Sequence, residues 1–269
     1  MGQFKIATYS DTCKEMEGKL NNPFPEDAVV RLGGTLDYSK YPIQINSKYA
    51  VQSSVNKLIV NLLLTGKEYI LPFLACYGKF CEGCSTFQGN DSLAEIAGKM
   101  YKGQPPRYII RPLGESGGEG IKIVDSQMKL LQNLNAAIAT PYVNVTSEYR
   151  FFCTQKEVFY IYKKIKKKDH KQDAYITRGN HIISPIEKCV KPRRLEDMKK
   201  ACLEVMNAIG LEIGAIDVIY DSSDNDNHRF YIVETNTGPE ISTKEIEAAF
   251  VAQLEKLIIQ KKQNEECVD

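Results

Sequence analysis

The N-terminal part of the chain changes from strand-like to helical hydrophobic patterning. Residues 3–8 and 28–32 form short apolar runs, separated by a loop rich in Pro and Asn, and such runs are typical of buried strands. From residue 46 onward, apolar residues recur at helical spacing until Gly66. They are Val51, Val55, Leu58, Ile59, Leu62 and Leu63. The pattern predicts a small N-terminal lobe, residues 1–45, which ends near Pro42 to Ile45 and is followed by one long helix.

The middle of the chain predicts a helix, a strand pair and a second helix. Ser92-Leu-Ala-Glu95 has the form of a capping box and therefore predicts a helix start. Strands are expected over 107–113 and 121–124, on either side of a glycine-rich turn. The next helix should carry Met128, Leu131, Leu134 and Ile138 on its apolar face.

The last part of the chain predicts two strand pairs and two helices. Strands are expected over 148–153 and 158–164, and again around Asp217 and Glu234. A helix over 195–209 should end at Gly210, and Ser242-Thr-Lys-Glu245 predicts the start of the final helix. With a lobe boundary near residue 141, we expect an α+β protein with lobes 46–141 and 142–269.

Composition and charge narrow the classes of function. The chain has 269 residues, is 43% apolar and carries a formal charge of +1, so it can bury a core and has no global field toward nucleic acid or acidic membranes. No apolar run is long enough to span a bilayer, and the N-terminus lacks the apolar core of a signal peptide. We therefore expect a cytoplasmic protein without membrane or nucleic-acid partners. Its oligomeric state is open, with a homodimer as one alternative.

Three of the eight cysteines lie close together in the sequence. Cys76, Cys81 and Cys84 fall within nine residues, and Cys-x-x-Cys is half of a zinc site. A second pair is missing, and the histidines lie far downstream. A loop with reduced thiols is therefore preferred over a structural metal.

Three oxygen-bearing residues stand on two apolar segments near the C-terminus. Glu234 and Asn236 are two apart and so share one face of a strand, while Asp217 lies in the preceding apolar run. If these strands pair as a hairpin, two carboxylates and an amide oxygen converge, as Mg²⁺ prefers. The alternative is that each acid is buried and paired with an arginine such as Arg150, because buried carboxylates persist only when paired or metal-bound.

A glycine-rich turn over residues 114–120 could bind phosphate. It joins two strands, so it is neither a P-loop nor a Rossmann turn. Glycines let backbone N–H groups approach phosphates closely, and Arg111 just before the turn can bind phosphate oxygens in a bidentate manner. A plain flexible turn is the alternative.

The lysine-rich run over residues 162–168 has two interpretations. Lys163 or Lys164 could point into a cleft while Lys166 to Lys168 form a solvated loop. A nucleic-acid patch is the alternative, although few aromatic residues are interleaved with these lysines. We expect one cleft lysine and assign it to Lys163.

Taken in order, these motifs resemble the ATP-grasp superfamily. Lys57, Arg111 with the glycine turn, Glu148-Tyr-Arg150, Asp217 and Glu234-Thr-Asn236 follow one another as in that family. The resemblance covers residues 46–260 and is closest to carboxylate–amine or carboxylate–thiol ligases such as glutathione synthetase-like enzymes. It implies two α+β lobes clasping ATP, preceded by a small truncated α/β lobe.

The resemblance also implies a role for each matching residue. Asp217, Glu234 and Asn236 would bind Mg²⁺, which Mn²⁺ could replace, and Arg150 and Arg111 would act in catalysis. One departure is Arg111, where the family more often has lysine. The implied nucleotide-binding residues are Lys57, Arg111, Gly117, Gly118, Gly120, Tyr142, Val143 and Lys163.

The function implied is an ADP-forming, ATP-dependent ligase that joins a carboxylate to an amine. In such ligases the carboxylate of a small molecule or peptide takes the γ-phosphate, and an amine then displaces phosphate from the acyl phosphate. This chemistry needs metal and cations around developing charge rather than a nucleophilic side chain. The alternatives are a nucleotide-binding module without catalysis and a kinase-type phosphotransferase.

Overall fold

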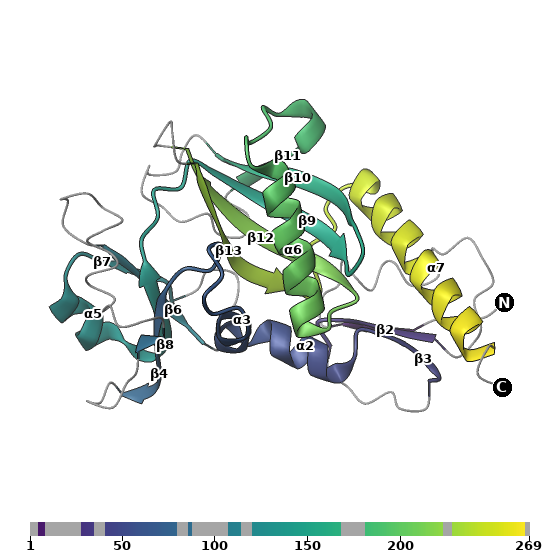
Figure 1. Cartoon of the computed structure of the whole chain (residues 1–269), viewed down its shortest axis with the longest axis horizontal. Coiled ribbons are helices and arrows are strands. Elements are labelled where there is room, and N and C mark those ends of the chain that lie inside the picture. Colours follow the sequence, from purple (N-terminus) through teal and green to yellow (C-terminus); the bar gives the residue numbers. More distant parts are fainter. Residues whose placement is uncertain are drawn as a thin grey trace.

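The described elements form three sheets with helices packed between and over them (Figure 1). The computed structural model describes residues 5–8, 28–34, 41–79, 86–87, 107–113, 120–167, 181–222 and 228–266. One sheet is parallel, and the other two contain only antiparallel pairs. The fold is therefore α+β, as predicted.

The N-terminal sheet has the strand order β1-β2-β3 and is parallel throughout. Its strands are β1 (Lys5–Thr8), β2 (Ala28–Leu32) and β3 (Ile43–Ile45). The first two confirm the predicted strands. The third was not predicted, because three residues directly after a proline give too short a pattern to recognise.

Asn46 fixes this sheet to the C-terminal part of the chain. Its backbone is left-handed, with φ 61°, a conformation that Asn adopts more readily than most residues. Its side-chain nitrogen donates to the carbonyls of Arg31 at 2.9 Å and Ile213 at 2.8 Å. Its Oδ1 accepts from the N–H groups of Glu212 at 2.9 Å and Ile213 at 3.0 Å. Because Asn46 is fully buried, these bonds hold two distant segments together.

The prediction of one long helix after residue 46 is wrong, because the structure has two short helices there. These are α2 (Lys48–Val55) and α3 (Lys57–Leu63). Asn56 between them is extended, and its Oδ1 accepts from the N–H of Leu58 at 3.0 Å, which starts a new helix. The change of direction also exposes part of the predicted apolar stripe. Val55 is 58% exposed and Leu63 51%, whereas Val51 and Leu58 are buried.

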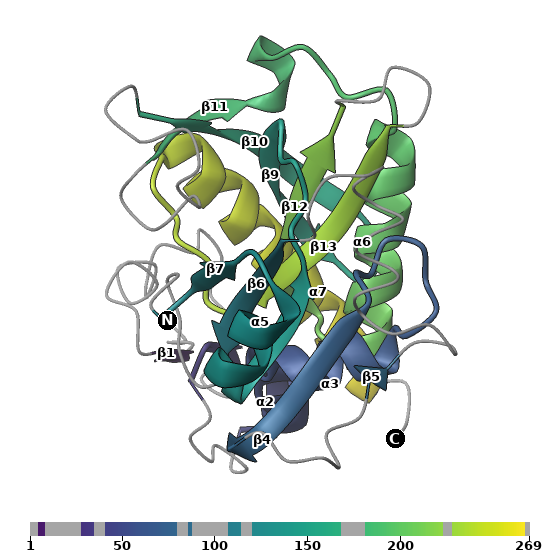
Figure 2. The same ribbon diagram turned by 90° about the vertical axis from the view of Figure 1, so that its left-hand side faces the viewer.

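The middle sheet has the strand order β5-β4-β8-β6-β7. Its strands are β4 (Phe73–Lys79), β5 (Thr86–Phe87), β6 (Tyr108–Pro112), β7 (Lys122–Val124) and β8 (Asn135–Pro141). The β6–β7 pair confirms the two strands predicted around the glycine-rich turn. Figure 2 shows this sheet in front of the C-terminal sheet.

The helix predicted to run from Met128 to Ile138 is too long. Helix α5 (Gln127–Asn133) ends early, and Ile138 lies in the central strand β8. Ala136 has φ 43°, which a helix does not allow. Pairing with β4 on one side and β6 on the other outweighs the helical spacing of these apolar residues.

The C-terminal sheet has the strand order β11-β10-β9-β12-β13. Its strands are β9 (Ser147–Thr154), β10 (Val158–Lys166), β11 (His181–Pro185), β12 (Ile213–Asp221) and β13 (Arg229–Asn236). A short 3₁₀ turn, η1 (Ile186–Lys188), follows β11. The predicted strands of residues 148–164 and the predicted hairpin of Asp217 and Glu234 are both present.

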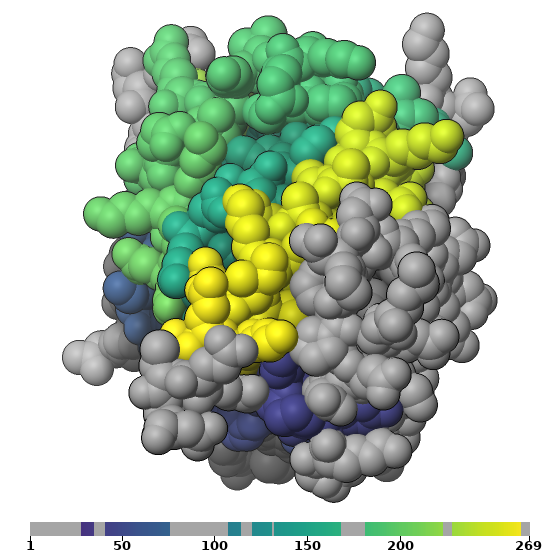
Figure 3. All heavy atoms as spheres, turned by 90° about the vertical axis from the view of Figure 1, so that its right-hand side faces the viewer, coloured from purple at the N-terminus to yellow at the C-terminus, as the bar shows by residue number. Residues whose placement is uncertain are grey.

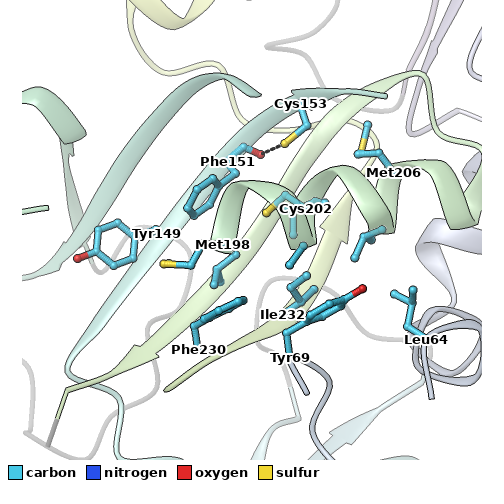
Figure 4. Close-up of a cluster of buried hydrophobic side chains, with 14 of the residues drawn as sticks. Leu64, Tyr69, Tyr149, Phe151, Cys153, Met198, Cys202, Met206, Phe230 and Ile232 are labelled. Carbon is cyan, nitrogen blue, oxygen red and sulfur yellow. Dashed lines mark hydrogen bonds between the residues drawn. The ribbon is translucent and has the colours of Figure 1, made fainter. Parts of the chain in front are cut away.

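Two helices cover opposite faces of this sheet. Helix α6 (Leu195–Ile209) packs on one face through residues such as Met198 and Cys202, which meet Phe151 of β9 (Figure 4). It ends at Gly210 with φ 69°, as predicted. Helix α7 (Lys244–Glu266) packs against the other face, and Figure 3 shows it lying across that side of the molecule.

Helix α7 packs as the sequence predicts but begins one residue later than the predicted capping box implies, because Thr243 rather than Ser242 is its cap. The hydroxyl of Thr243 accepts from the N–H of Ile246 at 3.2 Å, so Thr243 caps the helix. Ile246, Phe250 and Leu254 point into the core with 0% exposure. Within the described part of the chain, no helix is long and apolar enough to cross a membrane.

Candidate functional site

Three neighbouring strands bring a set of charged residues to one face of the C-terminal sheet. Asp217 of β12 lies opposite Arg150 of β9 and Glu234 of β13, and Ala215 lies opposite Asn236. Residues in register share a face, so Arg150, Asp217, Glu234 and Asn236 project together. This is the face that α7 covers farther along. The sequence prediction of convergence for Asp217, Glu234 and Asn236 therefore agrees with the strand register.

A β-bulge lies directly beside this set. Asp217 pairs with Glu234 but Val218 pairs with Ile232, so Val233 is an extra residue in β13. The carbonyl of Val233 accepts a hydrogen bond from Nη1 of Arg111 at 3.0 Å. Arg111 belongs to β6 in the middle sheet, is 6% exposed and leaves its buried Nε without a partner among the described residues. It thus connects the middle sheet to the strand that carries Glu234.

The Asp217 carboxylate is held by protein donors. Arg150 donates to both of its oxygens, from Nε at 2.6 Å and from Nη2 at 2.7 Å. Lys164 donates from Nζ at 2.9 Å, and Asn236 from Nδ2 at 3.4 Å. Burial by itself would raise the pKa of Asp217, but the Arg150 and Lys164 cations outweigh burial and hold that pKa well below its usual range.

Lys164 also binds a second buried acid, Glu148. Its ammonium group donates to a carboxylate oxygen of Glu148, and both side chains are nearly excluded from solvent. Burial would lower the pKa of Lys164, but the charges of Asp217 and Glu148 raise it well above its usual range. Lys164 is therefore a fixed cation shared by two carboxylates.

Glu234 differs from the other two acids. None of the described residues donates a hydrogen bond to its carboxylate, although the side chain is only partly exposed. Burial and then the Asp217 charge raise the pKa of Glu234, while the charge of Lys57 acts in the opposite direction. A partly buried carboxylate without a donor is suited to bind a cation or a protonated group.

The donor set fits a magnesium ion that obtains further ligands from outside the protein. No three His, Cys, Asp or Glu side chains gather for metal binding within the described residues. Glu234 and the amide oxygen of Asn236 have no described donors, while Asp217 is shared with Arg150 and Lys164. The contacts of Asp217 match the alternative of a buried acid paired with an arginine. Mg²⁺ commonly uses one or two carboxylates plus phosphate oxygens, so the set still fits.

Lys57 and Gly120, two of the predicted nucleotide-binding residues, belong to different elements of the fold. Lys57 is the first residue of α3 and acts electrostatically on Glu234. Gly120 has φ 67°, and a Cβ there would lie 2.8 Å from Cγ of Pro112, so the turn requires glycine. Gly117 and Gly118, like Cys81 and Cys84, lie outside the described residues.

Tyr142 and Val143 lie where the chain passes from the middle sheet to the C-terminal sheet. The Tyr142 N–H donates to the carbonyl of Arg107 at 2.8 Å, and the Arg107 guanidinium lies 4.3 Å from the centre of the Tyr142 ring. Val143 is buried against Leu71 and Tyr231. This segment therefore joins the two sheets at a fixed position.

Lys163 does not point toward the charged set. It lies opposite Tyr149 in the strand register, and its Nζ lies 5.9 Å from the centre of the Tyr149 ring. That face belongs to the core under α6. Its neighbour Lys164, the other lysine considered from the sequence, lies on the face of the charged set instead. Only the lysine that lies on the same sheet face as Arg150 can join the charged set. Which lysine this is follows from the pairing of β9 with β10, and that pairing is not visible in the sequence of one strand.

Glu148 is a member of the set that the sequence did not single out as a site residue. It is two residues before Arg150 and therefore shares its face. The two-residue spacing from Arg150 was the only sequence signal for Glu148. The role of Glu148 depends on Lys164, which lies opposite it on β10.

Solved structures of similar shape identify the fold. D-alanyl-alanine synthetase A from Vibrio cholerae matches with a TM-score of 0.61 and 12% identity, over 88% of this chain and 77% of that one. The VanG D-Ala:D-Ser ligase from Enterococcus faecalis matches with a TM-score of 0.59 and 12% identity, over 89% and 74%. The ATP-grasp ligase PsnB matches with a TM-score of 0.51 and 13% identity, over 83% and 66%.

These matches show that the chain has the ATP-grasp fold, which confirms the fold inferred from the order of its motifs. No family model and no curated protein sequence match the chain. At such low identity the matches establish architecture, and the residues of the site carry the functional argument.

Proposed function

We propose that this protein is an ATP- and Mg²⁺-dependent ligase that joins a carboxylate to an amine. The observation that carries the proposal is the convergence of Asp217, Glu234 and Asn236 with Arg150 on one sheet face of an ATP-grasp fold. A purely structural role would account for Asp217, which is paired. It would not account for Glu234, a partly buried acid to which no described residue donates.

The residues assigned to the metal are Glu234, Asn236 and Asp217. Mg²⁺ would supply charge neutralisation for the nucleotide phosphates. Glu234 is open to a cation as it stands. Asp217 would share its oxygens between the cation and its arginine and lysine partners.

The cations around this set are assigned to the phosphates and the reacting carboxylate. Arg111 has a buried Nε without a described partner, and Lys57 acts on Glu234 from the start of α3. Arg150 stands beside Asp217 on the same face as Glu234. Fixed cations placed in advance where negative charge accumulates lower the barrier to phosphoryl transfer.

The proposed reaction has two steps. An oxygen of the substrate carboxylate attacks the γ-phosphorus, the bond between the γ-phosphorus and the β-phosphate oxygen breaks, and ADP leaves. The amine nitrogen then attacks the acyl carbon, phosphate leaves with the bonding electron pair, and the amine proton passes to solvent. No protein nucleophile is needed.

Amino acids and peptides are the substrate class we propose. Support comes from the fold neighbours, which are described as a D-alanine–D-alanine ligase from Bacillus anthracis, a D-Ala:D-Ser ligase and a ligase bound to a minimal precursor. These substrates are those of the neighbouring proteins. They indicate which compounds to test first with this chain.

The test is ADP release over a matrix of amino acids and peptides, each offered alone and in pairs, with Mg²⁺ present. A ligase releases ADP and phosphate together when both a carboxylate and an amine are supplied, and hydroxylamine converts the acyl phosphate to a hydroxamate. Glu234→Gln should abolish this signal, and Lys163→Met, on the opposite face, should retain it.

Two other outcomes would replace the proposal. ADP release with a stable phosphorylated product and no free phosphate would indicate a kinase. Thermal stabilisation by ATP without turnover in any mixture would indicate a nucleotide-binding module.

A further inference from the structure

A row of four residues in register crosses the face of the C-terminal sheet that carries the charged set. Tyr162 of β10 lies opposite Arg150 of β9. Arg150 lies opposite Asp217 of β12, which lies opposite Glu234 of β13, and Figure 1 shows these four strands side by side. Residues directly opposite each other on neighbouring strands share a face, with Cβ atoms about 5 Å apart. The proposed function uses the last three residues of this row and leaves Tyr162 without a role.

The ring of Tyr162 belongs to the core, but its hydroxyl has no partner among the described residues. Tyr162 is 2% exposed, and its ring centre lies 5.8 Å from that of Phe152 in the cluster under α7. None of the described residues forms a hydrogen bond with the hydroxyl. Buried tyrosines usually have such a bond, and phenylalanine would fill the same space without burying a hydroxyl. Packing therefore accounts for the ring of Tyr162 and not for its hydroxyl.

Arg150 offers an unused donor next to this hydroxyl. Asp217 accepts from Nε and Nη2 of Arg150, which is only part of the donor capacity of a guanidinium. None of the described residues accepts a hydrogen bond from the third nitrogen, Nη1. Burial raises the pKa of Tyr162, while the nearby Arg150 cation acts in the opposite direction. The hydroxyl is therefore protonated at neutral pH, and two donors lie beside each other on the face of the charged set.

Two neighbouring donors of this kind suit a carboxylate better than an amine. A carboxylate accepts from a guanidinium and a phenol at the same time, whereas an ammonium group in the same place would be repelled by the Arg150 cation. Glu240, which follows β13, also acts on Tyr162 electrostatically and is the acid that would favour an amine. Glu240 is partly exposed and lies outside the row, while Arg150 lies directly opposite Tyr162.

We infer that the hydroxyl of Tyr162 and Nη1 of Arg150 together donate to the substrate carboxylate and orient it for attack on the γ-phosphorus. This inference rests on the proposed function and adds a residue that contacts the substrate. Tyr162 forms and breaks no covalent bond. Its contribution is to hold the reacting carboxylate in one orientation, which lowers the entropic part of the barrier.

The experiment uses Tyr162→Phe, which keeps the ring and removes only the hydroxyl. Tyr160→Phe is the matched control, because Tyr160 is two residues away on the same face of β10 and its ring also packs on Phe152. Urea unfolding and calorimetric titration with ATP and Mg²⁺ are measured for wild type and both variants. ADP release over the matrix of amino acids and peptides described above then gives kcat and separate KM values for the carboxylate and the amine.

All three proteins should unfold at the same urea concentration and bind ATP equally. Tyr162→Phe should raise the KM for the carboxylate by about tenfold and leave the KM for the amine within about twofold of wild type, and Tyr160→Phe should behave as wild type. A lower urea midpoint for Tyr162→Phe would mean that the hydroxyl is bonded within the protein and would overturn the inference. An increase confined to the KM for the amine would also overturn it.

The failure of this inference can be told apart from the failure of the proposed function. Turnover by wild type, with the same KM for the carboxylate in Tyr162→Phe, overturns the inference alone. Absence of ADP release by wild type in every mixture removes the proposed function and the inference with it.

Discussion

Arg150 of β9 and Asp217 of β12 lie opposite each other and form a bidentate ion pair, with nitrogen–oxygen distances of 2.6 and 2.7 Å. The pair lies at the centre of the candidate site, between Lys164 on one side and Glu234 on the other. It stabilises the site and also competes for the carboxylate that the proposed metal needs.

Breaking this pair should destabilise the protein more than removing it. Arg150→Met leaves a buried carboxylate short of a partner, and the free energy of unfolding should fall by about 3 kcal/mol. Arg150→Met combined with Asp217→Asn should recover much of that loss. Denaturant titrations of the wild type, the two single variants and the double variant give the coupling energy. Additive effects would mean that the two residues do not act as a pair.

Replacing Arg111 by the lysine more usual in the family should separate its two roles. Arg111→Lys keeps the positive charge but loses the hydrogen bond from Nη1 to the Val233 carbonyl, so ATP affinity should fall only a few-fold and stability by about 1 kcal/mol. Arg111→Met should weaken ATP binding by at least about tenfold. Calorimetric titration with ATP measures both. Equal ATP affinity in the two variants would rule out a charge-based role.

Much of the fold could be predicted from the sequence, and the errors have one local cause and one non-local cause. The shared face of Glu234 and Asn236 was predicted correctly, because side chains two residues apart point to the same face in any regular strand. The break at Asn56 was missed, since a capping side chain interrupts an otherwise continuous apolar stripe. The strand at Ile138 was missed because pairing on both sides decided its conformation.

The site shows the same division between local and non-local information. Asp217, Glu234 and Asn236 were identified because they are polar within apolar runs. Lys163 was chosen over Lys164 because strand parity across β9 and β10 cannot be read from one strand. The bulge at Val233, which gives Arg111 its acceptor, is likewise a property of two paired strands.

Asn46 should be among the most sensitive polar residues away from the candidate site. Asn46→Ala removes four side-chain hydrogen bonds and places alanine at φ 61°, so stability should fall by about 3 kcal/mol. Asn46→Gly loses the same bonds but tolerates the backbone and should lose about 1 kcal/mol less. Urea unfolding measures the difference, with the exposed Asn135→Ala as a control. Alanine and glycine variants of equal stability would argue against backbone strain at this position.

Tyr69 should give a stability contribution that depends on alkaline pH. Its hydroxyl donates to Glu204 at 2.7 Å, and burial, followed by this hydrogen bond, raises the pKa of Tyr69 well above its usual range. Tyr69→Phe should therefore lower stability by about 1 kcal/mol near neutral pH. The unfolded tyrosine ionises near pH 10, so the contribution is fully present below that pH and is lost as the pH rises above it. Urea unfolding of both proteins from about pH 8 to 11 should show the difference shrinking, and a constant difference would contradict the assignment.

The most direct test of the account is calorimetric titration of ATP into wild-type protein and Glu234→Gln, each with Mg²⁺ and with a chelator. If Glu234 helps to hold Mg²⁺ against the nucleotide phosphates, wild-type protein should bind ATP at least about tenfold more tightly with Mg²⁺ than with the chelator. Glu234→Gln should lose most of that difference. Equal ATP affinity in all four titrations, or no ATP binding at all, would contradict the assignment of this site.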